Sequence, residues 1–414
     1  MAASALELAW SSFATVGYSR SDTDFHYLRW IDEDGSFRNE TVAGLQLDLQ
    51  LAPRWSATMQ VRIASAMDSD DRWEVEPSWG FLAWRPADGW LLRAGKLRAP
   101  LYLYSEVLDV GVAHDMARLP VEMYALSPVN EVTGGSLSYD WTLDEAGDYL
   151  LNVTGYGGVT TATVRGWVPA GIPGLLPAGA YFLDNDVLAT GLVLDLSTPE
   201  TRVRLGLLRA RARPDVLTPK RFPRVDLAPG LGYYKVDSAL PGPPIQYQKI
   251  LHDDLITLGL DRRFGDGWRV TAEYARIIQH DVDLGSDSNG GYVALFKEWP
   301  RFTPYLSLSK LRSTDGQFGI YRKLLGDPLP PGSLGGAEAA INAAQAAVAA
   351  QSYVTDQQSL AIGTSVQVPG GKLKLEWAHT WVDETSRLID ERPTDPLIQD
   401  RDFNVWTLNY SVAF

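Results

Sequence analysis

The chain has 414 residues and no Cys, and its 37 basic and 51 acidic side chains give a formal net charge of −14. Without Cys, disulfide frameworks, Cys-based zinc sites and thiol nucleophiles are excluded. A pI near 4.9 and the lack of a basic stretch argue against a nucleic-acid partner. No apolar run reaches the roughly 18 residues that a transmembrane helix needs.

Two features of the chain leave its compartment open at this point. The first eight residues, Met1 to Leu8, lack the basic and apolar regions of a signal peptide. We therefore expect either a cytoplasmic protein or the mature chain of an exported protein whose signal has been removed. The mean hydropathy of −0.13 fits a soluble protein, but a transmembrane β-barrel also averages near neutral because its strands alternate.

Alternation of apolar and polar residues recurs along the whole chain. Leu45, Leu47, Leu49 and Leu51 alternate with polar residues, and Trp406 begins a similar pattern that ends at Phe414. Such alternation predicts strands with one apolar and one polar face. We predict sixteen strands, at about 6–19, 41–52, 55–67, 77–86, 89–97, 132–141, 147–157, 186–197, 201–213, 253–264, 267–278, 290–299, 301–312, 358–368, 371–383 and 402–414.

The connections alternate strictly between short and long. The short ones are 52–54, 86–88, 143–146, 197–200, 265–267, 299–301 and 369–371. The long ones lie near 20–40, 68–76, 98–131, 158–185, 214–252, 279–289, 313–357 and 384–401. A meander with tight turns at one end and long loops at the other is typical of a bacterial outer-membrane barrel. A soluble sandwich distributes its long connections between both ends.

The aromatic residues and the polar strand faces agree with this interpretation. Six Trp lie within a few residues of a short turn, where a barrel places an interfacial ring: Trp55, Trp84, Trp90, Trp141, Trp268 and Trp299. Sixteen strands enclose a lumen too wide for side chains to fill, so we expect the polar face to line it. The fold class is then an all-β transmembrane antiparallel barrel, with residues 1–414 as a single domain.

The chain resembles the sixteen-stranded porins of Gram-negative outer membranes. The terminal pattern from Trp406 to Phe414 looks like the signal that delivers such barrels to the insertion machinery. The segment from Leu92 to Tyr104 looks like one in a little-characterised proteobacterial group of porin-like proteins. The resemblance implies short periplasmic turns, long extracellular loops, a homotrimer, and contact with outer-membrane lipid and lipopolysaccharide.

The resemblance also implies that the third long loop, 98–131, folds into the lumen and constricts it. Its charges are Arg98, Glu106, Asp109, Asp115, Arg118, Glu122 and Glu131, a net charge of −3. Strand parity places Arg62, Arg93, Arg202 and Arg204 on the inner wall. Loop acids opposite wall bases set up a transverse field that selects ions. The alternative is that these charges are solvated or form structural ion pairs.

Three further segments stand out. Arg209, Arg211 and Arg213 form a basic row whose parity conflicts with that of Arg204 unless a bulge lies near Leu207–Leu208. This row lines the upper lumen, binds lipopolysaccharide phosphates or lies above the membrane. The long loop 313–357 contains an Ala-rich segment, 333–352, that predicts a helix capped by Ser333 and packed at the barrel mouth or restricting entry. We expect 166–183 to be a folded loop.

No motif predicts catalysis or a cofactor. The five His are dispersed, and only His114 lies beside an acid of the constriction loop, Asp115. Asp281, Asp283 and Asp287 match no complete calcium-loop spacing. We therefore expect no enzyme activity, metal or cofactor.

The favoured function is a porin that lets small hydrophilic solutes and ions diffuse through a water-filled, charge-lined pore. The first alternative is a substrate-specific outer-membrane channel, in which Tyr102, Tyr104 and Tyr124 contact a saturably bound solute. A barrel-embedded enzyme and a soluble secreted β protein are less favoured alternatives.

Overall fold

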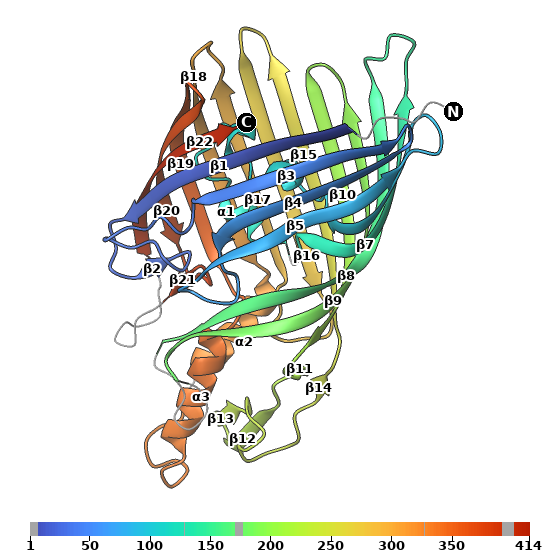
Figure 1. The fold of residues 1–414 in the computed structure, drawn as a ribbon. Coiled ribbons are helices and arrows are strands. Elements are labelled where there is room, and N and C mark those ends of the chain that lie inside the picture. The colour runs from blue at the N-terminus through green and yellow to red at the C-terminus, as the bar shows by residue number, and fades with distance from the viewer. Residues whose placement is uncertain (1–6, 128, 170–176, 327, 391–400) are drawn as a thin grey trace.

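A computed structural model describes residues 7–127, 129–169, 177–326, 328–390 and 401–414. It confirms the all-β barrel: sixteen antiparallel strands form one closed sheet, in which the last strand pairs with the first. The tight turns lie at one end and the long loops at the other (Figure 1). The barrel strands are β1 (Glu7–Ser21), β3 (Val42–Ala52), β4 (Trp55–Ser65), β5 (Trp73–Trp84), β6 (Trp90–Arg98), β7 (Glu131–Thr142), β8 (Leu150–Val168), β9 (Gly179–Ser197), β10 (Thr201–Pro214), β15 (Leu251–Phe264), β16 (Trp268–Gln279), β17 (Ser288–Lys297), β18 (Phe302–Ser313), β19 (Asp356–Val368), β20 (Gly371–Val382) and β22 (Arg401–Ala413).

Shorter elements occupy the long loops. Two of them, β2 and β21, pair with each other across the first and last loops. The described short elements are β2 (His26–Tyr27), η1 (Ser105–Val107), η2 (Gly111–Ala113), α1 (Val121–Tyr124), β11 (Thr218–Pro219), β12 (Arg224–Ala228), β13 (Leu231–Tyr234), β14 (Tyr247–Gln248), α2 (Asp315–Gly326), α3 (Glu338–Ala350) and β21 (Ile389–Asp390).

The alternation of β3 and β4 shows why these sequences form a barrel wall. Leu47 and Met59 lie opposite each other in the ladder and are exposed on the outside. Their neighbours Gln46 and Gln60 are also paired, and their amides hydrogen-bond at 3.0 Å on the inside. Closure of the sheet leaves the barrel wall without an unpaired edge, which is the condition for a sheet to cross a hydrocarbon layer.

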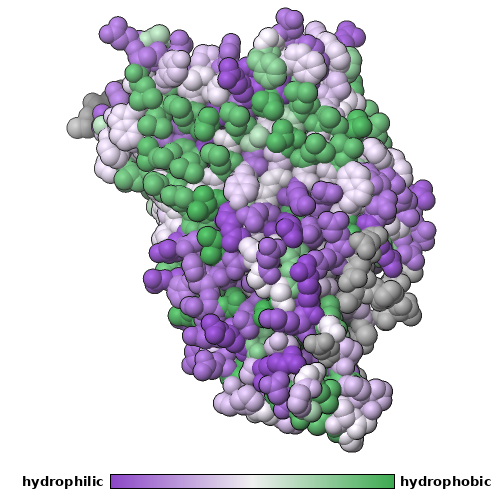
Figure 2. Space-filling model, turned by 180° about the vertical axis from the view of Figure 1, so that it is seen from behind, coloured by the Kyte–Doolittle hydropathy of each residue, from purple (hydrophilic) through white to green (hydrophobic). Residues whose placement is uncertain are grey.

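The outer surface carries an apolar belt on the turn half of the molecule. Figure 2 shows a continuous band of hydrophobic residues above a predominantly hydrophilic loop end. All six Trp that the sequence places near short turns are exposed, and Trp55 stacks on Trp84 with ring centroids 5.5 Å apart. Indole rings are favoured at a membrane interface, so this placement supports an aromatic ring at the turn end.

The loop end differs from the expectations in several places. Strand β8 continues to Val168, and strand β9 already begins at Gly179. Most of the predicted loop 158–185 is therefore a projecting pair of strands. Residues 170–176, the centre of the predicted folded loop 166–183, lie outside the described residues. The period-two signal failed here because this pair extends beyond the barrel wall, where no apolar face is required.

The long loop 313–357 contains two helices where one was predicted. The Ala-rich helix α3 begins at Glu338, and its N-cap is Ala337 rather than Ser333. The Glu338 carboxylate accepts hydrogen bonds from the backbone N–H groups of Gly332, Leu334 and Gly336, which replaces a hydroxyl cap. The helix α2 was missed because its three glycines obscure the helical pattern.

The loop 214–252 packs on these helices and forms a core of its own. Phe222 and Val236 contact Phe318 and Tyr321 of α2 in one cluster, and Tyr233 contacts Ile341 of α3 in another. Both clusters lie beyond the barrel, at the loop end (Figure 1). This core is separate from the one inside the barrel.

The strand β10 resolves the parity conflict without a bulge. Its pairing with β9 and β15 is continuous, so Arg204 and Leu208 are buried on the inside while Arg209, Arg211 and Arg213 are exposed. No bulge lies near Leu207–Leu208, so of the three positions considered for the Arg row, the one in the lumen is wrong. No helix in the described part of the chain is long and apolar enough to cross a membrane.

Candidate functional site

The segment 98–131 leaves the wall after β6 and crosses the lumen before it returns as β7. It carries η1, η2 and α1 and is interrupted by Pro100 and Pro120, so it cannot continue the ladder. The backbone carbonyl of Leu101 accepts a hydrogen bond from Thr257 of β15, and the N–H of Leu103 donates to Glu273 of β16. We call this segment the lumen loop.

An apolar core fastens the lumen loop to the strands from β8 to β18. Leu101, Met116 and Met123 are at most 1% exposed, and they belong to a cluster with wall residues such as Leu208 and Phe296. The expectation of a wholly polar inner face is therefore wrong for this half of the barrel. Here the loop, rather than water, covers the wall.

The first acidic attachment of the lumen loop is Asp109. Its carboxylate accepts hydrogen bonds from Arg62 at 2.8 Å and from Arg98 at 2.7 Å. Arg62 also contacts Glu76, and Arg98 also contacts Glu131. Burial tends to raise the pKa of Asp109, but the charges of Arg98 and Arg62 outweigh that effect and hold the pKa below its usual value.

The second attachment is Asp115, on the opposite side of the lumen. It accepts hydrogen bonds from Arg269 of β16 at 2.6 Å, Lys372 of β20 at 2.9 Å and Ser365 of β19 at 2.8 Å. Although burial raises the pKa of this carboxyl, Lys372 and Arg269 lower it well below the usual value. The neighbouring His114 has a pKa far below normal because of burial and the nearby Lys374. Its Nδ1 lies 2.9 Å from the carbonyl of Met116 and 3.2 Å from Lys374.

Arg118 and Glu122 complete the attachments. Arg118 contacts Glu40 at 2.7 Å and donates to Ser19 of β1 and Thr407 of β22. Glu122 is 1% exposed and accepts hydrogen bonds from Ser309, Gln357 and Ser359, with no ion pair to a described residue.

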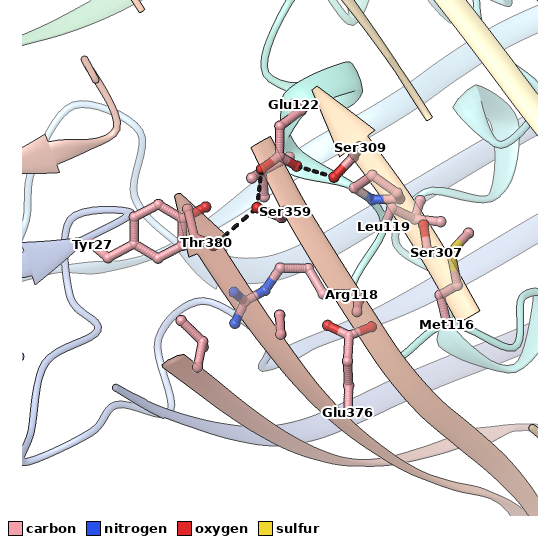
Figure 3. A pocket seen from close by; sticks show the side chains of 15 residues that line it. Tyr27, Met116, Arg118, Leu119, Glu122, Ser307, Ser309, Ser359, Glu376 and Thr380 are labelled. Carbon is pink, nitrogen blue, oxygen red and sulfur yellow. Dashed lines mark hydrogen bonds between the residues drawn. The ribbon is translucent and has the colours of Figure 1, made fainter. Parts of the chain in front are cut away.

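Figure 3 shows Arg118 and Glu122 on the wall of a small cavity between the lumen loop and strands β18 to β20. Its volume of about 40 Å³ admits only a few water molecules. The cavity is therefore a gap behind the loop and too small for a solute pathway.

The three tyrosines predicted as solute contacts are packed against the wall. Tyr102 is 2% exposed within the apolar core, and its ring lies 5.2 Å from that of Tyr124. Tyr124 donates to Glu273 at 2.6 Å. Burial raises the pKa of Tyr104 to about 12, so this hydroxyl stays protonated. The contact of these tyrosines with a solute stays a prediction, and for the buried Tyr102 it requires the loop to move.

Arg93 and Glu106 differ from the other charged groups of the lumen. Arg93 lies over the ring of Phe81 at 5.6 Å, is only partly buried, and forms no ion pair with a described residue. The Glu106 side chain is 43% exposed and reaches Arg204 at 3.4 Å. Arg93 and Glu106 interact electrostatically but do not contact each other. Asp109 and Asp115, in contrast, contact their wall bases directly.

Sequence reasoning missed several wall residues that hold the loop. Glu273, Glu376, Lys372 and Lys374 all lie on inward faces of β16 and β20. The sequence does contain a signal for these residues, because each of them alternates with exposed apolar residues along its strand and must therefore face the lumen. Among the described residues, no group of three His, Cys, Asp or Glu is placed to hold a metal ion.

Comparison with known proteins gives the fold its context. No protein-family model and no curated protein sequence matches the chain. Many solved structures match it, and several of them cover nearly the whole chain. The trimer form of OmpT, an outer membrane protein of Vibrio cholerae, matches with a TM-score of 0.51 and 9% identity over 99% of this chain and 100% of that chain. An anion-selective porin from Comamonas acidovorans matches with a TM-score of 0.52 and 10% identity over 99% and 100%.

The third structure is the outer membrane channel DcaP of Acinetobacter baumannii, with a TM-score of 0.50 and 12% identity over 98% of this chain and 97% of that chain. At these identities the likeness concerns the fold. It agrees with the closed barrel of sixteen strands. The chain is therefore a transmembrane β-barrel with the fold of the Gram-negative outer-membrane porins.

Proposed function

We propose that this chain is an outer-membrane channel that lets small hydrophilic solutes and ions diffuse past its lumen loop, and that it has no catalytic role. The observation that carries the proposal is the inner face of β3 to β6. Gln46, Asp48, Arg62, Glu76 and Arg93 are polar and only partly buried there, inside a closed barrel with an apolar exterior. A partly exposed polar wall supports a water-filled path on this side of the lumen.

The narrowest charged gap of that path is proposed to lie between Arg93 and Glu106. Directly bonded pairs such as Asp109 with Arg98 largely cancel each other, so they contribute little field at a distance. Arg93 and Glu106 do not contact each other, and both are accessible to water. Glu106 reaches Arg204 at 3.4 Å, so Arg204 offsets part of its charge. A transverse field across this gap orients dipolar solutes and selects ions.

A substrate-specific channel is the second candidate, and one observation favours it. The lumen loop contacts strands on several sides of the barrel, including β4, β10, β16, β19 and β22. A loop held on so many sides leaves a narrow passage, in which a solute sheds much of its water. Saturable block of the current by one class of solute supports this candidate.

Single-channel recording in planar bilayers tests the proposal. We expect stable conductance steps, with a reversal potential in a salt gradient that moves towards cation selectivity in Arg93→Gln and towards anion selectivity in Glu106→Gln. The control variants Arg224→Gln and Asp226→Asn remove the same charges from an exposed ion pair at 2.9 Å in the hairpin β12–β13. Absence of conductance refutes a channel, while equal shifts in the controls remove Arg93 and Glu106 from the path.

The proposed assembly is a homotrimer with its tight turns in the periplasm. The trimer form of OmpT supports the oligomeric state by fold alone, and the hydrophilic loop end in Figure 2 fits an extracellular position. Contact with lipopolysaccharide and delivery through Phe414 remain part of the same proposal.

A further inference from the structure

The exposed Arg row of β10 begins where the apolar belt ends. On the outer face of β10 and β15, Leu207 and Ile256 form the last exposed apolar pair, 40% and 42% exposed. The next outward positions of β10 are Arg209, Arg211 and Arg213. From Leu207 to Arg211 the strand rises about 13 Å, and tilt shortens this rise to the depth of a lipid headgroup layer.

The three guanidinium groups are not equivalent. Arg209 is bound to Asp254 at 2.7 Å. Arg211 lies between Leu188 of β9 and His252 of β15 in the ladder, so no acid faces it directly, and it forms no ion pair with a described residue. Arg213 faces Asp186 in the ladder but forms no ion pair within the described residues either.

Exposed apolar side chains continue the surface above the Arg row. Val216 and Leu217, just before β11, are 55% and 48% exposed. Tyr247 and Ile250, in and just after the paired strand β14, are 38% and 39% exposed. The pairing of β11 with β14 places these two stretches side by side. None of the four side chains belongs to the described hydrophobic clusters.

The acids around this surface are already engaged or lie at its margin. Asp254 contacts Arg209 and His280, and Asp184 accepts a hydrogen bond from Thr163. Asp186 lies on the β9 side with Thr161 at 3.5 Å, and Asp215 is exposed beyond Arg213. Lys249 is an additional exposed base beside Ile250.

We infer that this surface docks a phosphate-bearing membrane lipid of the outer leaflet. We define it as the rim patch: Arg211, Arg213, Val216, Leu217, Tyr247, Lys249 and Ile250. Free guanidinium groups bind phosphate oxygens in bidentate fashion, and adjacent apolar side chains enter the acyl boundary. A lipid has both a phosphate group for the guanidinium groups and acyl chains for the apolar side chains. Free phosphate has no apolar part, so it fits the surface less well. The inference rests on the proposed outer-membrane orientation and assigns residues to the proposed lipopolysaccharide contact. It is independent of conduction, because the rim patch faces away from the lumen.

Native mass spectrometry of the intact barrel tests the rim patch. The protein is reconstituted in phosphatidylcholine vesicles with and without lipid A, extracted, and scored for retained lipid A. We expect the double variant Arg211→Gln, Arg213→Gln to retain at least tenfold less lipid A than the unmodified chain. The matched control Arg209→Gln removes a paired guanidinium from the same row, and we expect a change of less than twofold.

Further measurements decide between the possible occupants of the rim patch. The variant Leu217→Ser, Ile250→Ser should also lower lipid A retention, while millimolar inorganic phosphate should not displace the lipid. Equal retention in the double Arg variant, or displacement by phosphate alone, overturns the inference. A changed oligomeric mass in that variant instead assigns the surface to a subunit contact. Channel conductance in pure phosphatidylcholine should be unaltered throughout.

Discussion

At the residue scale, the lumen buries its carboxylates in two ways. Asp109 and Asp115 are each held by two cationic side chains. Glu122 and Glu273 instead accept hydrogen bonds from hydroxyl, amide or backbone N–H groups alone. Removing the acid of a buried ion pair leaves a buried positive charge without a partner. The resulting loss in the free energy of unfolding is larger than the stability that the intact pair contributes.

The substitution Asp115→Asn tests this asymmetry. The side chain is 11% exposed, and its loss leaves Arg269 and Lys372 without their shared acid. We expect a loss of about 2–4 kcal/mol in the free energy of unfolding. Heat-modified mobility on gels, recorded as a function of temperature, measures it. The exposed acid Asp226, 74% exposed in its ion pair, gives the control Asp226→Asn, for which a loss of similar size contradicts the argument.

At the element scale, the lumen loop and the loop 313–357 contrast in what they pack against. The lumen loop shares the apolar core of the barrel wall, whereas α2 and α3 pack mainly on the loop 214–252. The hydrogen bond from Ser313 to Thr355 at 2.8 Å also shows that the loop 313–357 begins and ends at one point. One loop is therefore part of the barrel, and the other is an addition to it.

Acid should release the lumen loop only at low pH. The pKa values of Asp109 and Asp115 are held below normal in the folded state, so both carboxyls gain protons more readily when the loop is detached. Their stabilisation is complete above a pH of about 4 and is lost as the pH falls further. Limited proteolysis at graded pH detects the release. Cleavage of the loop that begins between pH 7 and pH 5 speaks against these two attachments.

Replacing residues 315–354 by a short Gly-Ser linker should leave the barrel folded. The linker has only to join Thr314 to Thr355, because Ser313 and Thr355 are already hydrogen-bonded to each other, and the core inside the barrel is untouched. We expect the thermal midpoint to change by a few degrees at most. Heat-modified mobility and circular dichroism measure this, with replacement of 101–127 as the destabilising comparison. Loss of the barrel in the first variant refutes the separation of the two cores.

The sequence predicted elements better than contacts. Inside the belt, the strands followed from the side-chain alternation, because a lipid-facing residue at every second position is a strong and local requirement. The ends of β8 and β9 beyond the belt did not follow from it. The partners of Asp109 and Asp115 were not predictable, because they depend on which strands lie across the lumen. The same holds for α2, whose Phe318 and Tyr321 are buried by the distant Phe222 rather than by local sequence. Arg204 was placed inside correctly, but the outward direction of Arg209 needed a continuous ladder.

At the scale of the whole molecule, the barrel reverses the usual arrangement of an apolar interior and a polar exterior over part of its wall. The side chain at position 47 faces the belt, and the one at position 46 faces the lumen. The surrounding lipid is therefore as much a requirement of this fold as its sequence. The fold resembles that of solved outer-membrane proteins despite identities near 10% because this requirement constrains the pattern rather than the residues.

Two Lys substitutions at neighbouring positions test this arrangement. We expect Leu47→Lys to cost about 2–4 kcal/mol, because the charge enters the apolar belt. Gln46→Lys should cost much less, because its side chain lies beside Asp48 in the polar lumen. Urea titration of folding into lipid vesicles measures both free energies. Similar costs at the two positions contradict the assignment of the faces.

The contacts of Arg118 have a consequence for the order of folding. This side chain joins Ser19 of the first strand to Thr407 of the last, and Asn409 of the last strand donates to the carbonyl of Ala117. Ser19 and Thr407 lie opposite each other in the ladder of β1 with β22, so this set of contacts requires the ring of strands to be closed. The lumen loop therefore cannot make all its contacts before the first and last strands of the barrel have paired. A lumen loop that makes all these contacts is therefore found only in a barrel whose first and last strands have joined.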